Sequence, residues 1–230
     1  MPIAVDSTAS GTSTTYGTLC SHVLASGSGN NRVVVVGVTT RGFNNVISGA
    51  TFNGVAMTAG PANSVYQFGY FVQTQLFYML DAALPASPGT YTVAVGGSGT
   101  LWSVAGGSVA VTGAKQQAPE ATLVGTTQNS GASITSTISG VSDGAMVFDS
   151  VVVDLSAGSG TATGTNQTER WDRTLSSDTG MGSTAPKTGA GSQTMSWTFS
   201  GTGSGACQVL MSFAALGDPA IGSLELGAEF

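Results

Sequence analysis

Short runs of apolar and β-branched residues recur along the chain, separated by clusters of Gly, Ser, Asn and Asp. Their spacing of about 8 to 12 residues is typical of an all-β sandwich or barrel, and helical periodicity is nearly absent. The pattern predicts strands at 17–24, 31–39, 46–52, 72–80, 90–95, 101–112, 132–138, 145–154, 161–173, 192–199 and 206–216. We therefore expect an antiparallel, jelly-roll-like β-sandwich of about ten strands.

The predicted strands differ in how deeply the sequence buries them. Residues 33–36 and 151–153 are all valine, and a continuous apolar run is expected where both faces of a strand are covered. Residues 91–95 and 196–199 alternate apolar and polar side chains, which is typical of a strand that faces the core on one side. The valine runs are therefore predicted to be central strands and the alternating segments peripheral ones.

A weak internal repeat divides the chain into two similar halves. Residues 20–38 and 132–153 both consist of a strand, a turn cluster and a buried valine strand, and residues 90–112 and 192–216 both consist of an alternating strand, a glycine-rich loop and a second strand. Two such halves suit a double Greek key in one domain. The alternative is two small tandem domains with a boundary near 116–127, where Pro119 and Glu120 interrupt the pattern.

Both ends of the chain differ from the middle. Residues 1–16 are rich in Ser and Thr and are expected to form an N-terminal arm, outside a sandwich domain at 17–216. Residues 217–230 form the predicted C-terminal arm, which alternates apolar and polar residues like an added strand. Its candidate assembly contacts are Ile221, Leu224, Leu226 and Phe230.

The composition favours a folded protein and disfavours nucleic acid as a partner. Hydrophobic residues make up 41% of the chain and charged residues 8%, whereas disordered chains are rich in charge. The net charge of −6, from 6 basic and 12 acidic residues, would repel a phosphate backbone. No segment reaches the ~20 apolar residues of a membrane span, and the first residues lack the basic and apolar regions of an export signal.

The cysteines and the single histidine do not assemble a recognisable metal motif. Cys20 and Cys207 lie in predicted strands near opposite ends of the chain, where they either pair as a disulfide or stay as buried free thiols. His22 would share a strand face with Cys20, but no further ligands are close in sequence. We therefore expect a structural histidine and no bound metal or cofactor.

One segment imitates a catalytic motif. Residues 140–144 read Gly-Val-Ser-Asp-Gly, whereas a nucleophile elbow needs a helix after the serine and a histidine later in the chain. Here a strand follows Ser142, and His22 precedes it. Asp149 and Asp154 fall on opposite faces of one strand and cannot share a site as a carboxylate pair. The sequence therefore predicts a turn at 140–144 and no enzyme.

Aromatic residues are the main sequence signal for a binding function. Carbohydrate-binding modules stack sugars on exposed aromatic rings. Segment 66–71 is aromatic and follows a Gly-Pro-Ala-Asn loop, so it is expected either as an exposed tip or intersubunit contact, or in the core. Trp102 and Trp197 are expected in the core. The charged run 169–173 is interpreted as a solvated strand or loop. Candidate glycan or partner contacts are Tyr66, Phe68, Tyr70 and Trp171.

Several segments of the first half resemble β-sandwich domains of tailed-bacteriophage structural proteins and bacterial surface proteins. They include Gly-Ser-Gly-Asn-Asn-Arg-Val-Val-Val-Val-Gly-Val at 27–38, Ala-Thr-Phe-Asn-Gly-Val-Ala-Met-Thr at 50–58, and the segments 19–23, 76–80 and 89–93. The likeness covers residues 18–112, and the second half in pattern alone; residues 218–227 also look like tails of phage structural proteins. It implies a virion or cell-surface role and carries no catalytic residues.

The leading hypothesis is a structural virion protein, of the capsid decoration (cement) or fibre type, assembled in the host cytoplasm. It would bind copies of itself and a capsid or other virion protein through residues 1–15 and 217–230. The alternative is a carbohydrate-binding module of a surface or tail-fibre protein, with its site at 66–71 or at Trp171. A third hypothesis, an extracellular filament subunit, shares the terminal-strand logic of the first.

Overall fold

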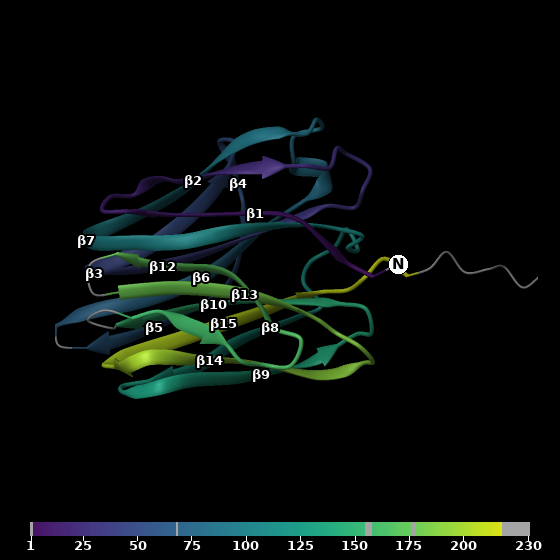
Figure 1. Ribbon diagram of the computed structural model, residues 1–230. Helices are drawn as coiled ribbons and strands as arrows, with labels where there is room; N and C mark the ends of the chain where they lie inside the picture. Colours follow the sequence, from purple (N-terminus) through teal and green to yellow (C-terminus); the bar gives the residue numbers. More distant parts are fainter. Residues whose placement is uncertain (1, 68, 155–157, 176–177, 218–230) are drawn as a thin grey trace, which may run out of the picture.

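The computed structural model describes residues 2–67, 69–154, 158–175 and 178–217, which form fifteen strands and one short 3-10 helix, Asp81–Ala83 (Figure 1). The first half contains β1 (Ala4–Ser13), β2 (Gly17–Leu24), β3 (Val33–Phe52), β4 (Val55–Ala56), β5 (Thr58–Gln67), β6 (Tyr70–Leu80) and β7 (Gly89–Thr112). The second half contains β8 (Ala121–Gln128), β9 (Gly131–Val141), β10 (Met146–Asp154), β11 (Gly160–Ala162), β12 (Thr168–Leu175), β13 (Asp178–Pro186), β14 (Gly191–Gly203) and β15 (Gly205–Phe213). The protein is all-β, and the sheets are antiparallel.

The two halves repeat one sheet topology. The first sheet has seven strands: a main path of five, β1-β7-β3-β6-β5, and β2 and β4 paired off this path. The second sheet runs β8-β15-β10-β13-β12, so that each strand of the main path has a counterpart at the same place. The central strands pair with both neighbours without a register shift over nine positions, from Val33 to Arg41 in β3 and from Met146 to Asp154 in β10. The predicted repeat is therefore present in the strand order, and Arg41 and Asp154 occupy equivalent positions.

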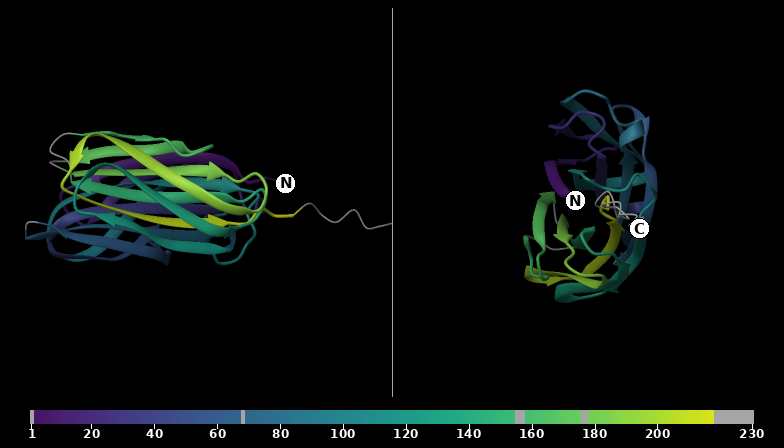
Figure 2. Two further views of the ribbon diagram at one scale, coloured as in Figure 1. Left: turned by 90° about the horizontal axis from the view of Figure 1, so that it is seen from below. Right: turned by 90° about the vertical axis from the view of Figure 1, so that its right-hand side faces the viewer.

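The five-stranded main path of the first sheet packs face to face against the five-stranded second sheet, in opposite strand order. β1 lies against β12, and β5 lies against β8 and β15, so equivalent strands are exchanged as by a two-fold axis (Figure 2). The shared core between them includes Val35 and Leu76 from the first half and Phe148 and Phe213 from the second. Because each sheet buries its inner face against the other, the halves form one continuous structure.

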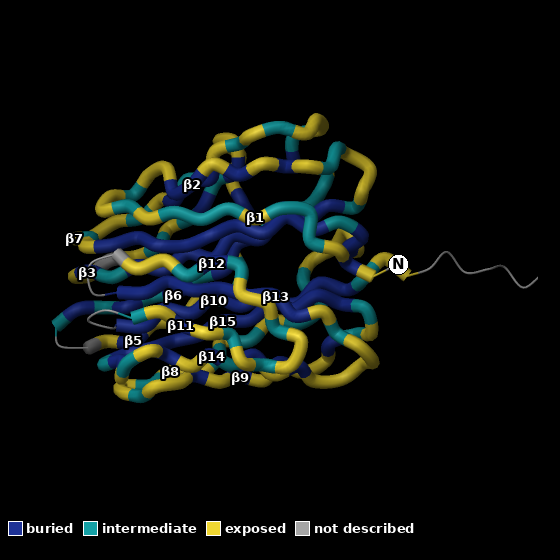
Figure 3. The backbone as a smooth tube through the Cα atoms, viewed as in Figure 1, coloured by how far each residue is buried: buried dark blue, intermediate teal, exposed yellow. Residues whose placement is uncertain are grey.

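A smaller layer covers the outer face of each five-stranded sheet. In the first half, long strands β3 and β7 bend out of the inner sheet, and β2 and β4 pair with their outer parts. In the second half, this layer is a separate sheet of order β11-β14-β9. Figure 3 shows the consequence: buried strands run through the middle of the molecule, and exposed positions gather on the outer strands. Residues 33–36 and 151–153 are buried, and Trp197 is fully buried, as predicted.

Several strand predictions are wrong in their boundaries. Segments 31–39 and 46–52 are parts of the single strand β3, and 90–95 and 101–112 are parts of β7, because irregular pairings between these strands carry them past their glycines without a break. The predicted strand 161–173 is two strands, β11 and β12. Strands β1, β4, β5, β8 and β13 were not predicted, since their Gly, Ser, Thr, Ala and Pro content hides the alternation.

The N-terminal arm expected at 1–16 is instead mostly strand. Ala4–Ser13 forms β1, which pairs with β7 from Thr112 to Val104. These residues therefore already have a strand partner within their own chain. The C-terminal arm begins at Gly217, the last described residue in that region. The candidate assembly contacts Ile221, Leu224, Leu226 and Phe230 lie outside the described residues.

Candidate functional site

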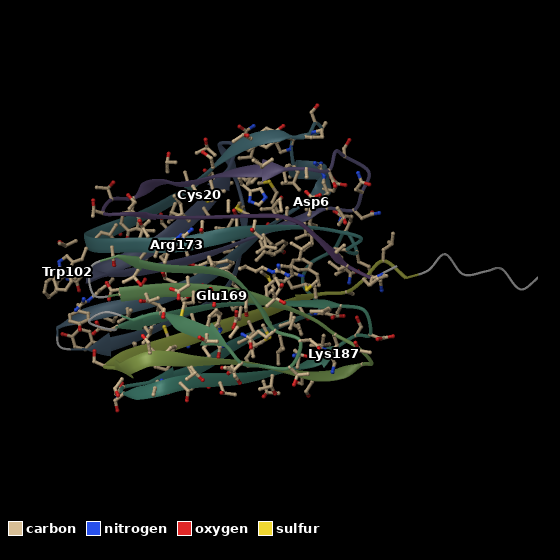
Figure 4. All side chains as sticks on the ribbon, in the orientation of Figure 1. Asp6, Cys20, Trp102, Glu169, Arg173 and Lys187 are labelled. Atoms are coloured by element: carbon tan, nitrogen blue, oxygen red, sulfur yellow. The ribbon has the colours of Figure 1, made fainter. Side chains whose placement is uncertain are left out.

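Exposed aromatic side chains gather at one end of the molecule. Trp102 lies at the left end in Figure 4, whereas the N-terminus and the last described residues lie at the right end in Figure 1. Phe43 is 44% exposed and meets Trp102 edge-on, with ring centroids 4.9 Å apart. Trp102 is 37% exposed, so its predicted place in the core is wrong.

A β-bulge directs Trp102 to this position. Arg41 pairs with Ser103, but the next β3 residue, Gly42, pairs with Leu101, so Trp102 is the additional residue on β7. A bulge turns a side chain away from the face that simple alternation would give it. The Trp102 ring consequently lies beside Arg41 and Tyr70 at the end of the interface between the halves.

Arg41 is held between two rings and two carboxylates. Its Cζ lies 3.9 Å from the Tyr70 ring centroid and 4.9 Å from that of Trp102. Its nitrogens lie 3.6 Å from Asp154 Oδ1 and 3.4 Å from Asp178 Oδ1, both in the second half. We call Arg41, Tyr70, Trp102, Asp154 and Asp178 the arginine cluster. It connects the two halves with charge-assisted contacts that are largely shielded from water.

Hydroxyl groups complete the arginine cluster. Tyr70 Oη donates a hydrogen bond to Asp154, as does Ser204 Oγ, and Ser103 Oγ donates to Asp178 at 2.7 Å. Burial raises the pKa of Asp178 to about 6, although the Ser103 hydrogen bond and the Arg41 charge lower it. Burial, with the neighbouring Asp154, also raises the pKa of Tyr70. The cluster is therefore held together by its own donors and acceptors.

A groove lies on the outer face of the first sheet, toward the same end. Its volume is about 320 Å³, and it is lined by Val46, Ile47, Ala62, Asn63, Ser64, Gln73, Thr74 and Gln75. The long strand β3 supplies one wall as it bends into the outer layer, and strands β5 and β6 supply the floor. No ionisable side chain lines this groove.

The predicted aromatic contacts have different fates. Tyr66 is 60% exposed and lies 4.9 Å from Phe71, centroid to centroid, on the outer face of the β5–β6 pair. Tyr70 is buried in the arginine cluster, which removes it as a stacking platform. Trp171 is also buried, because β12 lays its ring on the sheet interface, so a sugar cannot reach it. Phe68 lies outside the described residues.

Sequence reasoning missed Arg41, Gln73 and Gln75. Arg41 follows two threonines in the strand that begins with the valine run, and nothing in that local pattern distinguishes it from the other basic residues of the chain. The available signal for the glutamines was the alternation of polar and apolar residues in β6, which places them on one face. The alternation does not show that this face is partly uncovered.

The apparent catalytic motif has a structural role. Ser142 Oγ donates to Glu120 at 2.7 Å in the turn between β9 and β10, where Gly140 and Gly144 adopt positive φ. β9 and β10 belong to different sheets, so the turn carries the chain between layers and does not close a hairpin. Asp149 and Asp154 do face opposite sides of β10: Asp149 accepts from Trp197 Nε1 within the second half.

His22 and the cysteines are buried and separate. His22 Nδ1 lies 2.6 Å from Ser108 Oγ, and Nε2 lies 2.9 Å from Ser7 Oγ, which fits the structural role predicted for it. Cys20 and Cys207 are free thiols in different halves, so the disulfide alternative is wrong. Within the described ranges, no group of three or more His, Cys, Asp or Glu side chains is placed to hold a metal ion.

Comparisons with known proteins add no relative. No described helix has the length and apolar character needed to cross a membrane. No protein-family model, no curated protein and no solved structure matches this chain.

Proposed function

We propose that this is a structural, non-enzymatic protein that self-associates through a strand supplied by residues 217–230. The observation that carries the proposal is the strand that follows the first half of the chain. After β7 it crosses to the other sheet, where residues 121–128 form β8 on the edge beside β15. Residues 217–230 follow the last strand of the second half, β15, just as the segment that contains β8 follows the last strand of the first half, β7. Leu224 and Leu226 alternate with Glu225, which is typical of a strand.

Strand β8 is the acceptor edge that best fits this proposal. An edge strand that lacks charge and proline is a template for strand addition. β8 has neither, whereas β5 contains Pro61 and β12 contains four charged residues. Val124 on β8 is 59% exposed, and β8 and β9 together line a hollow of about 320 Å³. Addition of one copy's C-terminal segment to another copy's β8 would give a head-to-tail assembly.

The polarity of the molecule supports an assembled, surface-displayed role. Pro2 and Gly217 line one hollow, so both ends of the described chain lie together, opposite the end that carries Trp102. Assembly at the end that carries Pro2 and Gly217 would leave the end that carries Trp102 exposed. On the sequence resemblance we propose that the assembly belongs to a virion, as a decoration or fibre protein bound to a capsid or other virion protein. The same proposal includes a jelly-roll-like β-sandwich for the whole chain, and the extracellular filament is its alternative setting.

Truncation tests this function. Removal of residues 217–230 is expected to leave a folded monomer, because the described fold ends at that point, and to abolish the concentration-dependent assembly of the full chain, measured by light scattering coupled to size exclusion. Val124→Lys should weaken assembly by placing a charge on β8. Val23→Lys, on the exposed face of β2, is the matched control. A truncated chain that assembles as well as the full chain, or a full chain that stays monomeric at all concentrations, overturns the proposal.

A further inference from the structure

The groove on the outer face of the first sheet presents an ordered set of side chains. Strands β5 and β6 bring Ala62 opposite Gln75, Ser64 opposite Gln73, and Tyr66 opposite Phe71. Successive pairs are two residues apart along each strand, about 7 Å, and point to the same face. The floor therefore continues from a small apolar residue through amides and a hydroxyl to a pair of aromatic rings.

The second half shows what this place looks like when it is closed. Gln75 pairs with Val38 on β3; at the equivalent place Met181 pairs with Val151 on β10. Met181 is fully buried and packs against Gly160 of β11, where no Cβ would fit. The same sheet position is therefore apolar and covered in one half, but polar and open in the other.

This difference between the halves indicates that the groove is a specific feature of the first half and not a packing gap common to both. In the second half, Met181, Gly160 and the short strand β11 close the equivalent position. The first half has instead the wall formed by Val46 and Ile47, which stands beside the glutamines and leaves about 320 Å³ open. That volume lies at the lower end of the range for small-molecule sites, about 300–1,000 Å³.

The chemistry of the groove selects a neutral, hydroxyl-rich ligand. Glutamine and serine side chains offer both donors and acceptors, which suits hydroxyl groups, and the Tyr66 ring offers a flat face for the C–H side of a sugar ring. No lining residue would neutralise a charged ligand, and the protein's net charge of −6 would repel an anion. A wholly apolar ligand would displace water from the Gln75 amide without replacing its hydrogen bonds.

We propose that this groove binds a neutral oligosaccharide, with one sugar ring stacked on Tyr66 and its neighbour hydrogen-bonded to Gln73 and Gln75. The site gives the free end of the proposed assembly a target, but it does not depend on assembly. Residues 217–230 and β8 take no part in it, so the two proposals fail independently.

Binding to an array of immobilised oligosaccharides, with neutral and acidic members, tests this site. The wild-type chain is expected to bind neutral members. Tyr66→Ala removes the stacking surface, and Gln75→Met installs the side chain found in the closed half. Each should weaken binding of the identified glycan roughly 2- to 13-fold, the range that corresponds to one stacking contact or one net hydrogen bond. Titration calorimetry with that glycan measures the change.

Matched variants separate the site from general damage. Gln117→Met makes the same substitution on the exposed linker between the halves and should leave affinity unchanged. Equal melting temperatures for all variants establish that the fold is retained. Folded wild-type protein that binds no glycan, that binds acidic glycans alone, or whose binding survives both groove substitutions overturns the proposal. Removal of residues 217–230 should leave glycan binding unchanged, whether or not the full chain assembles.

Discussion

The buried histidine couples the stability of the fold to pH. Burial lowers the pKa of His22 to about 4 from its ordinary value of 6.5, although the charge of Asp6 raises it in part. The unfolded chain therefore takes up a proton on His22 at a higher pH than the folded protein does. Stability from neutral His22 is present above pH 6.5 and is lost as the pH falls through about 4.

His22→Gln should remove this dependence. Glutamine can still bond to the hydroxyls of Ser7 and Ser108, but it does not titrate. A shift from 6.5 to about 4 corresponds to a loss of about 3 kcal/mol in the wild type between pH 7 and pH 3.5, and the variant should lack this part. Urea unfolding of both proteins at several pH values measures it.

Two buried carboxyls act in the opposite direction, and the comparison with the variant accounts for them. Burial raises the pKa of Asp149 and of Asp178 to about 6, so each lowers stability as the pH rises from about 4 through 6. Both remain in His22→Gln, and their contribution cancels in the difference between the two proteins. Parallel pH profiles for the wild type and the variant would contradict the assignment to His22.

At the scale of elements, the ring of Trp171 explains a set of glycines on three different strands. Gly37 on β3, Gly107 on β7 and Gly182 on β13 each lie directly against this ring, which β12 places between the sheets. A Cβ on Gly37 would stand 2.5 Å from Trp171 Cζ2 and 2.9 Å from Ser150 Oγ. Glycine is required here for close approach, since Gly37 does not have a positive φ.

Gly37→Ala should therefore destabilise the protein by about 1–3 kcal/mol, the usual cost of overpacking a core. Gly49→Ala lies on the same strand, where a Cβ would meet nothing within 4 Å, and should be neutral or stabilising by up to about 1 kcal/mol. Thermal unfolding of the three proteins gives the comparison. Equal losses in the two variants would mean that backbone freedom, and not contact with Trp171, decides the effect.

The sequence predicts those elements whose own side chains carry the signal. Residues 33–36 and 151–153 are central because nothing but covered strands tolerates continuous valine, and Trp197 is in the core as its alternating strand indicates. Bulges have no such signal, so the exposure of Trp102 could not be predicted. Trp171 stands in a charged run on an edge strand, and its burial depends on glycines distant in sequence.

At the scale of the whole molecule, the two repeated halves form an interface with each other. Sequence similarity predicted two halves, and their packing in opposite strand order places the equivalent residues Arg41 and Asp154 opposite each other, 3.6 Å apart. Opposite charges at these equivalent positions attract the two halves to each other. The groove beside Gln75 and its closed counterpart at Met181 are a second difference between equivalent positions, on the outer face. Pattern similarity cannot reveal such differences, because they lie in single side chains.

The interface prediction concerns Arg41. Arg41→Met keeps the bulk between Tyr70 and Trp102 but leaves Asp154 and Asp178 without their cation, which should cost about 3–5 kcal/mol at pH 7. Loss of the cation raises the pKa of Asp178 above its wild-type value of about 6, so the cost grows as the pH rises above about 6 and is smaller at pH 5 than at pH 7.

Arg173→Met on the exposed edge of β12 is the matched control for this substitution and should change stability by less than about 0.5 kcal/mol. Calorimetric unfolding of both variants at pH 5 and pH 7 provides the measurement. A penalty that is the same at both pH values would show that Arg41 stabilises the fold through its ring contacts, and that its charge contributes nothing to holding the halves together.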